Sequence, residues 1–231
     1  MHRLFESHIR WLLDVRRPKS LLEVGVLRGA NTLKLLEWCA QNGASLTSLD
    51  PLGWEGNLPD EIKQPFEGYK YKRGQKQFAD MVVVPEYLEI VYRQGLDQHW
   101  ICLKMRSLEY LQSPSFAGFD MYLIDGDHNY FTVSNELRLI HEKGKIGDVL
   151  LFNDVVGRWA RQDLYYDPTF IPNEYRGGPR QGVLTAIEDF LDSLSRRRLW
   201  WRLDCPYRFK IVTRRHDGLG LLERVRPANE A

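Results

Sequence analysis

Two carboxylates and an imidazole come directly after an apolar run in the segment LIDGDHNY, residues 123–130. These side chains are Asp125, Asp127 and His128. Carboxylates bind divalent cations and histidine exchanges protons near neutral pH, so this spacing allows metal binding and proton transfer. The plainer interpretation is a polar turn at the end of a buried strand. The choice between the two depends on the elements that position these residues.

Short apolar runs alternate with helical periodicity along most of the chain. The predicted strands are 20–25, 46–50, 100–105, 119–124 and 149–153, followed by hairpin strands over LWWRL, FKIVT and LGLLE. The predicted helices are 4–15, 31–42 with Asn31 as the N-cap, 86–94, 130–140 and 183–194. This alternation predicts an α/β fold, with a mainly parallel sheet, helices on both faces and a C-terminal antiparallel hairpin.

Polar or glycine-rich residues follow each of the five predicted parallel strands. They are the glycine turn at 25–29, Asp50, Ser107, the segment Asp125–His128, and the pair Asn153 and Asp154. Parallel sheets bind ligands beyond the carboxyl ends of their strands. The sequence therefore predicts a ligand site built from these strand ends.

Bulk composition excludes several classes of protein. The chain has 231 residues, 43% of them hydrophobic, and a formal net charge of +1. Neither nucleic acid nor an anionic membrane is indicated as the main partner. The chain also lacks an apolar leader, a run of about 20 apolar residues and a CxxC pair, which favours a cytoplasmic protein without structural disulfides.

The expected organisation is an N-terminal covering helix over 1–17 and a single domain over 18–231. Two long loops interrupt this domain, at about 51–77 and 155–180. The second loop is rich in aromatic residues. It could close over an acceptor such as a sugar or a macrolide, or its aromatic rings could simply pack the loop onto the sheet.

The turn Glu23-Val24-Gly25-Val26-Leu27-Arg28-Gly29 has the form ExGxxxG. Glycines at this place let backbone N–H groups approach a ligand, and the helix that follows begins with an electropositive end. The alternative is a simple strand-to-helix turn. Asp50 could likewise accept hydrogen bonds from a ribose diol or only form a turn before Pro51.

Taken together, EVGxxxG, SLDP, IDGDHxY and the acidic dipeptide after the strand 149–153 resemble class I S-adenosylmethionine-dependent methyltransferases. The closer resemblance is to the bacterial branch that includes macrocin-type sugar O-methyltransferases, and it covers about residues 18–215. It implies a Rossmann-like domain that transfers a methyl group from S-adenosylmethionine to a hydroxyl of a small molecule.

The resemblance also implies roles for the cofactor residues. Glu23, Gly25 and Gly29 would line the methionine end of the cofactor, and Asp50 would hold the ribose hydroxyls. Arg106 stands where the family usually has an acid that reads the adenine. Ser107 or backbone groups would then recognise the adenine.

For the chemical step, the resemblance implies Asp125, Asn153 and Asp154 as Mg²⁺ ligands and His128 as the general base. Asp125 would also face the cofactor, and Asp127 would orient His128 or cap the following helix.

Two other functions fit parts of the sequence. Arg106 and Asn153 are compatible with a methyltransferase fold that has lost activity and serves as a binding or regulatory protein. Asp125-Gly126-Asp127 could also be the DxD motif of a nucleotide-sugar glycosyltransferase, although the glycine turn and Asp50 favour the methyltransferase. The expected partner is a small-molecule acceptor, and a homo-oligomer is compatible with the sequence.

Overall fold

The computed structural model describes residues 1–51, 90–165, 168–195 and 205–226. The chain forms two compact units, Met1–Ser107 and Leu108–Ala231, which we call the N-terminal and C-terminal units. All but the first residue of the predicted loop 51–77, and the predicted strand LWWRL, lie outside the described residues.

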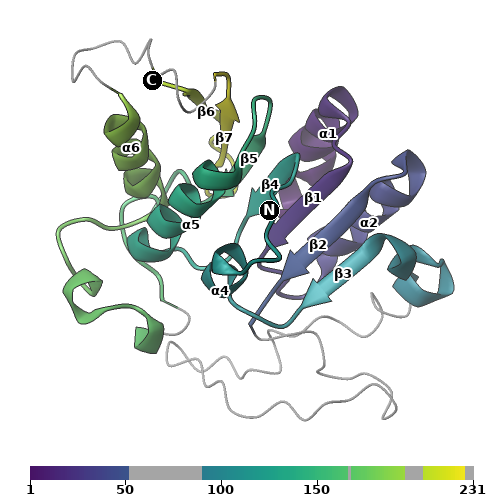
Figure 1. Cartoon of the computed structure of the whole chain (residues 1–231), viewed down its shortest axis with the longest axis horizontal. Coiled ribbons are helices and arrows are strands. Elements are labelled where there is room, and N and C mark those ends of the chain that lie inside the picture. Colours follow the sequence, from purple (N-terminus) through teal and green to yellow (C-terminus); the bar gives the residue numbers. More distant parts are fainter. Residues whose placement is uncertain (52–89, 166–167, 196–204, 227–231) are drawn as a thin grey trace. The chain divides into compact units, whose positions relative to one another are not determined.

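The N-terminal unit contains three parallel strands in the order β3-β2-β1 (Figure 1). Its described elements are the short helices η1 (His2–Leu4) and η2 (Phe5–Ile9), α1 (Arg10–Arg16), β1 (Ser20–Val24), α2 (Ala30–Asn42), β2 (Ser45–Leu49), η4 (Leu96–His99) and β3 (Trp100–Leu103). Four of the five residues in β1 and in β2 are buried, as expected for strands of a covered parallel sheet.

The N-terminal helical segment buries the face that the sequence predicts, because Phe5, Ile9 and Leu12 are all at most 3% exposed. The predicted N-cap of α2 is wrong by two residues. Gly29, with a left-handed φ of 82°, is the N-cap, and Asn31 lies inside the first turn. The side chain of Asn31 donates a hydrogen bond to Glu23 instead of capping the helix.

The C-terminal unit contains four strands in the order β4-β5-β7-β6 (Figure 1). From the helix that joins the two units onward, the elements are α4 (Ser107–Gln112), β4 (Met121–Ile124), α5 (Tyr130–Lys143), β5 (Val149–Asn153), η5 (Pro168–Phe170), η6 (Asn173–Tyr175), α6 (Val183–Leu194), β6 (Tyr207–Thr213) and β7 (Leu219–Arg224). β4 and β5 are parallel, whereas β7 is antiparallel to both β5 and β6. The predicted α/β fold with mainly parallel strands and a C-terminal antiparallel hairpin is therefore confirmed.

The strands differ in how deeply they are buried. All of β4 and the first four residues of β5 are buried, whereas β6 alternates between buried or half-buried and exposed positions over its first half. A strand at the edge of a sheet can tolerate such exposure. Among the described residues, none of the helices has the length and apolar character needed to cross a membrane.

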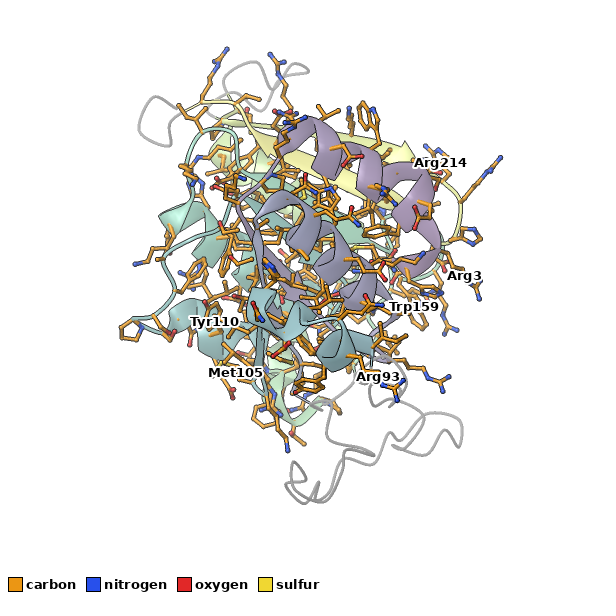
Figure 2. The ribbon with its side chains drawn as sticks, turned by 90° about the vertical axis from the view of Figure 1, so that its right-hand side faces the viewer. Arg3, Arg93, Met105, Tyr110, Trp159 and Arg214 are labelled. Atoms are coloured by element: carbon orange, nitrogen blue, oxygen red, sulfur yellow. The ribbon has the colours of Figure 1, made fainter. Side chains whose placement is uncertain are left out.

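The segment after β5 packs its backbone against the start of α6. The N–H groups of Val183 and Leu184 donate to the carbonyls of Trp159 and Ala160, at 3.0 and 3.1 Å. Figure 2 marks Trp159 on the ribbon. Gly182 has a φ of +85°, and a Cβ at this position would lie 2.6 Å from backbone atoms of Ala160. Glycine at 182 is therefore required by both conformation and close approach.

We expect Gly182→Ala to lower the free energy of unfolding by about 1–3 kcal/mol more than Gly177→Ala. Gly177 also has a positive φ, +71°, but a Cβ added there would meet no atom within 4 Å, so it serves as the control for a positive φ without a close approach. Urea denaturation of both variants measures the difference. Equal losses would show that the close approach at Ala160 contributes nothing.

Candidate functional site

The turn between β1 and α2 depends on left-handed backbone conformations. Gly25 and Gly29 have φ values of 92° and 82°, and Leu27 between them has a φ of 50°. The N–H of Gly25 donates to the carbonyl of Leu49 at the end of β2, at 2.9 Å. The turn is thereby fixed to the neighbouring strand, as well as to its own helix.

Asp50 contacts this turn through its carboxylate. Its Oδ2 accepts hydrogen bonds from the N–H groups of Val26 and Leu27, both at 2.9 Å. The residue is only 5% exposed, so these bonds compensate for the removal of the carboxylate from water. The structure thus brings the predicted cofactor residues Gly25, Gly29 and Asp50 into one cluster, in which Asp50 organises the turn.

Glu23 lies beneath the same turn and is 1% exposed. Its carboxylate accepts hydrogen bonds from Asn31 Nδ2, Thr32 Oγ1 and Ser48 Oγ, at 2.9, 2.7 and 2.8 Å. The network links β1 to the first turn of α2 and to β2. Glu23 therefore contributes to the position of the turn from below.

We expect Glu23→Ala to lower the free energy of unfolding by about 3 kcal/mol, because three donors lose their acceptor. Glu23→Gln is the matched control and should cost less. The Oδ1 of Asn31 is buried and has no hydrogen-bond partner in the described part of the chain, so the Asn31 amide can rotate to accept from the new Gln. Chemical denaturation compares the two variants, and equal losses would contradict this account.

The C-terminal unit carries the second cluster, at the ends of β4 and β5. One ligand atom each from Asp125, His128 and Asp154 lie within 4.8 Å of one another. His128 Nδ1 and Asp154 Oδ2 are 2.9 Å apart, and each of these two side chains is 8% exposed. The ends of these parallel strands therefore bring Asp125 and His128 of the opening motif together with Asp154.

Asn153 is the remaining residue of the predicted metal set. Its Nδ2 donates to Asp154 Oδ2 at 3.2 Å. Its Oδ1 is buried and has no hydrogen-bond partner among the described residues. A buried amide oxygen in this state, on a side chain that contacts the Asp154 carboxylate, is a suitable ligand for a hard cation such as Mg²⁺.

Asp127 supports the start of α5, which was one of the two roles that its position allowed. Its Oδ2 accepts from Asn129 Nδ2 at 2.5 Å and from Thr132 Oγ1 at 3.2 Å. Asn129 is the N-cap of α5, and its side chain accepts from the N–H of Thr132. Asn129 was not predicted as a cap, although an asparagine just before an apolar helical run is a recognisable cap signal.

Opposing effects set the pKa of His128. Burial lowers it, but the hydrogen bond with Asp154 and the charges of Asp154, Asp125 and Asp127 raise it, and the net result is a pKa above the ordinary value. Because the folded-state pKa is raised, the pair stabilises the folded protein below the unfolded-state value of about 6.5. This stabilisation is lost as the pH rises through the folded-state pKa.

In the metal-free protein, Asp154→Asn should lower the pKa of His128, because burial then meets less opposition. The loss of stability relative to the native protein should be largest at mildly acid pH and should shrink as the pH rises. NMR titration of the imidazole and thermal unfolding across pH measure both effects. Asp127→Asn removes a carboxylate that raises the pKa of His128 through its charge, so it should lower that pKa less than Asp154→Asn does. An equal or larger fall would contradict the assignment of Asp154 as the main partner of His128.

Ser107, the predicted adenine contact, is the first residue of α4 and is 7% exposed. Asp163, in the segment after β5, was not predicted as a site residue. Its carboxylate accepts from the N–H of Tyr130, two residues after His128, at 2.8 Å. An isolated aspartate in a long loop carries no sequence signal of such a contact.

Comparison with known proteins identifies the family. A family model described as a methyltransferase domain matches residues 22–155, more than half of the 231 residues. The chain belongs to this family of methyltransferase domains. No curated protein matches the chain in sequence.

Solved structures support the fold at low sequence identity. The SAH-bound Podospora anserina methyltransferase PaMTH1 is 13% identical and has a TM-score of 0.56, with 97% of this chain and 79% of that chain covered. The Streptomyces achromogenes O-methyltransferase TomG, involved in tomaymycin synthesis and solved in complex with SAM, is 14% identical and has a TM-score of 0.51. The match covers 94% of this chain and 78% of that chain. The N-methyltransferase NodS from Bradyrhizobium japonicum WM9 is 15% identical and has a TM-score of 0.50, with 97% of this chain and 94% of that chain covered. The fold is thus common to O- and N-methyltransferases.

Proposed function

We propose that the protein transfers a methyl group from S-adenosylmethionine to a hydroxyl group of a small molecule. Membership of the methyltransferase domain family supports the reaction class. The observation that carries the choice of a hydroxyl acceptor is the buried hydrogen bond between His128 and Asp154 beside Asp125. A hydroxyl must lose its proton as it is methylated, and this cluster offers a base held in place by a carboxylate.

In this proposal the N-terminal unit binds the cofactor. Gly25 and Gly29 open the turn so that its backbone can approach the methionine end, while Asp50 and Glu23 hold the turn in shape. Asp50 would also face the ribose, and Ser107 the adenine. Solved relatives of the fold with bound SAH or SAM are consistent with this cofactor.

In the chemical step, His128 takes the proton of the acceptor hydroxyl. The acceptor oxygen then forms a bond to the methyl carbon as the carbon–sulfur bond breaks, leaving S-adenosylhomocysteine. Asp154 orients the imidazole and stabilises the positive charge that His128 acquires. Only the neutral imidazole can accept the proton, so activity should increase as the pH rises through the pKa of His128.

Asp125, Asn153 and Asp154 fit a divalent cation, with Asn153 Oδ1 as the buried oxygen that has no hydrogen-bond partner in the described residues. Mg²⁺ held there would lower the pKa of an acceptor hydroxyl and help to orient it. We therefore include Mg²⁺ in the proposal as an assisting ion.

The family match favours methyl transfer over the DxD glycosyltransferase.

The acceptor class that we propose is a sugar or another partly apolar natural product, because aromatic side chains follow β5. Phe131 and Tyr175 pack with their ring centres 4.9 Å apart, and Tyr175 remains 39% exposed. We also propose a cytoplasmic location, since Cys39, Cys102 and Cys205 are an odd number of cysteines, far apart in the sequence and without a CxxC pair.

Two measurements test the proposal. Isothermal titration calorimetry should show binding of S-adenosylhomocysteine, and His128→Ala should leave this binding unchanged. Methyl transfer to an acceptor found by screening sugars and phenols with Mg²⁺ should fall by about 10²–10⁴-fold in His128→Ala.

His8, a half-buried histidine in the short helix η2, serves as the control, and His8→Ala should retain full activity. No binding of S-adenosylhomocysteine by the native protein would overturn the proposed function. Binding without turnover, unaffected by His128→Ala, would favour a non-catalytic binding protein.

A further inference from the structure

The segment that carries His128 has little regular structure of its own. Residues 125–129 lie between β4 and α5, and a single isolated β-bridge, between His128 and Leu164, is their only strand-like pairing among the described residues. In that bridge the N–H of Leu164 donates to the carbonyl of His128 at 3.1 Å. The position of the imidazole therefore depends on what fixes the segment from outside.

The segment Asp154–Leu164 contacts His128 at both of its ends. Asp154 holds the imidazole through its side chain, and Leu164 holds the backbone. Between these ends, the carbonyls of Trp159 and Ala160 accept from the first N–H groups of α6. The segment Asp154–Leu164 thus contacts both the start of α6 and the proposed general base, His128.

Asp163 completes this arrangement with one carboxylate. Its Oδ1 accepts from the N–H of Tyr130 at 2.8 Å and from the N–H of Gly182 at 2.7 Å. Its Oδ2 accepts from the hydroxyl of Tyr165 at 2.5 Å. One oxygen therefore joins the first residue of α5 to the N-cap of α6.

Electrostatics favours a carboxylate at this point. α5 has 14 residues and α6 has 12, and the N-termini of both present partly positive N–H groups to Asp163. Burial together with the hydrogen bond to Asp163 raises the pKa of Tyr165 to about 12, so its hydroxyl stays protonated and donates. Asp163 is thus held as an acceptor for three donors.

We propose that Asp163 is a positioning residue for the general base: by tying the start of α5 to the start of α6, it holds His128 in register with Asp154. The proposal rests on the proposed function for its catalytic consequence. Asp163 touches neither the reacting atoms nor the imidazole, and it acts through the backbone on either side of His128. Leu164 on one side and Tyr130 on the other are the points of contact.

The test compares Asp163→Ala with Asp189→Ala. Asp189 accepts a hydrogen bond from the hydroxyl of Tyr130 and pairs with Arg180, so its removal disturbs the same tyrosine without freeing its N–H. Asp163→Asn, which keeps one oxygen for the two N–H groups, is the conservative variant. All three are made in the full-length protein.

The first measurement is the ¹⁵N NMR signal of the His128 imidazole at one fixed alkaline pH, which reports its hydrogen bond with Asp154 without any acceptor. We expect the signal to move toward that of a free histidine in Asp163→Ala and to stay in place in Asp163→Asn and Asp189→Ala. If Asp163→Ala does not fold, Asp163→Ser, whose shorter side chain cannot reach both N–H groups, takes its place.

The second measurement is steady-state methyl transfer. A misplacement of the base by about 1 Å costs about 100-fold, so kcat should fall by that factor in Asp163→Ala. The KM for S-adenosylmethionine should stay unchanged, and Asp163→Asn should restore most of the rate.

An unchanged His128 signal in Asp163→Ala, or an equal change in Asp189→Ala, would overturn the positioning role. A native protein that binds no S-adenosylhomocysteine would overturn the proposed function instead, so the two failures are distinguishable.

Discussion

Both units depend on the same physical constraint: a carboxylate removed from water must be compensated by hydrogen bonds. Glu23 and Asp50 meet this requirement in the N-terminal unit, and Asp154 meets it in the C-terminal unit. Each of these acids accepts from groups on another element. The need to compensate buried charge therefore links strand ends to the turns beside them, which a purely apolar contact would not orient.

The same acids have the chemical properties that methyl transfer requires. Asp50 aligns the N–H groups of Val26 and Leu27, and Asp154 fixes one nitrogen of His128. Because the acids already have partners, the geometry is established before any ligand binds, which reduces the reorganisation needed during the reaction. In the proposed function, structural and chemical roles would be combined in the same side chains.

The strands could be predicted from the sequence because burial leaves a local pattern. β5, predicted as 149–153, spans Val149–Asn153. The hairpin strands β6 and β7 contain the predicted runs FKIVT and LGLLE. The contacts of single polar side chains could not be predicted in this way. Glu23 binds Ser48, 25 residues away, and Asp163 binds Tyr130, 33 residues away. Nothing in the local sequence specifies such pairs, since they form only when the sheet has brought the elements together.

The predicted N-cap at Asn31 was wrong for a related reason, because Glu23 offers its amide a buried acceptor and Gly29 can adopt the left-handed conformation two residues earlier.

Backbone strain marks positions where a particular geometry is kept although it lowers the stability of the folded protein. Five non-glycine residues in the described part of the chain have a positive φ. Three of them are explained by ordinary turns, since Arg17 ends α1 and His216 and Asp217 lie in the hairpin between β6 and β7. The other two are Leu27, in the glycine turn, and Asp154, beside His128. A left-handed non-glycine residue costs about 1–2 kcal/mol, and such residues persist where surrounding contacts hold them in place. The hydrogen bond from the N–H of Leu27 to Asp50 and the hydrogen bond between Asp154 and His128 are those contacts. Among the described residues, strain held by buried or part-buried hydrogen bonds therefore occurs at the turn proposed to bind the cofactor and beside the proposed base. This distribution is expected if both places are kept for function rather than for stability.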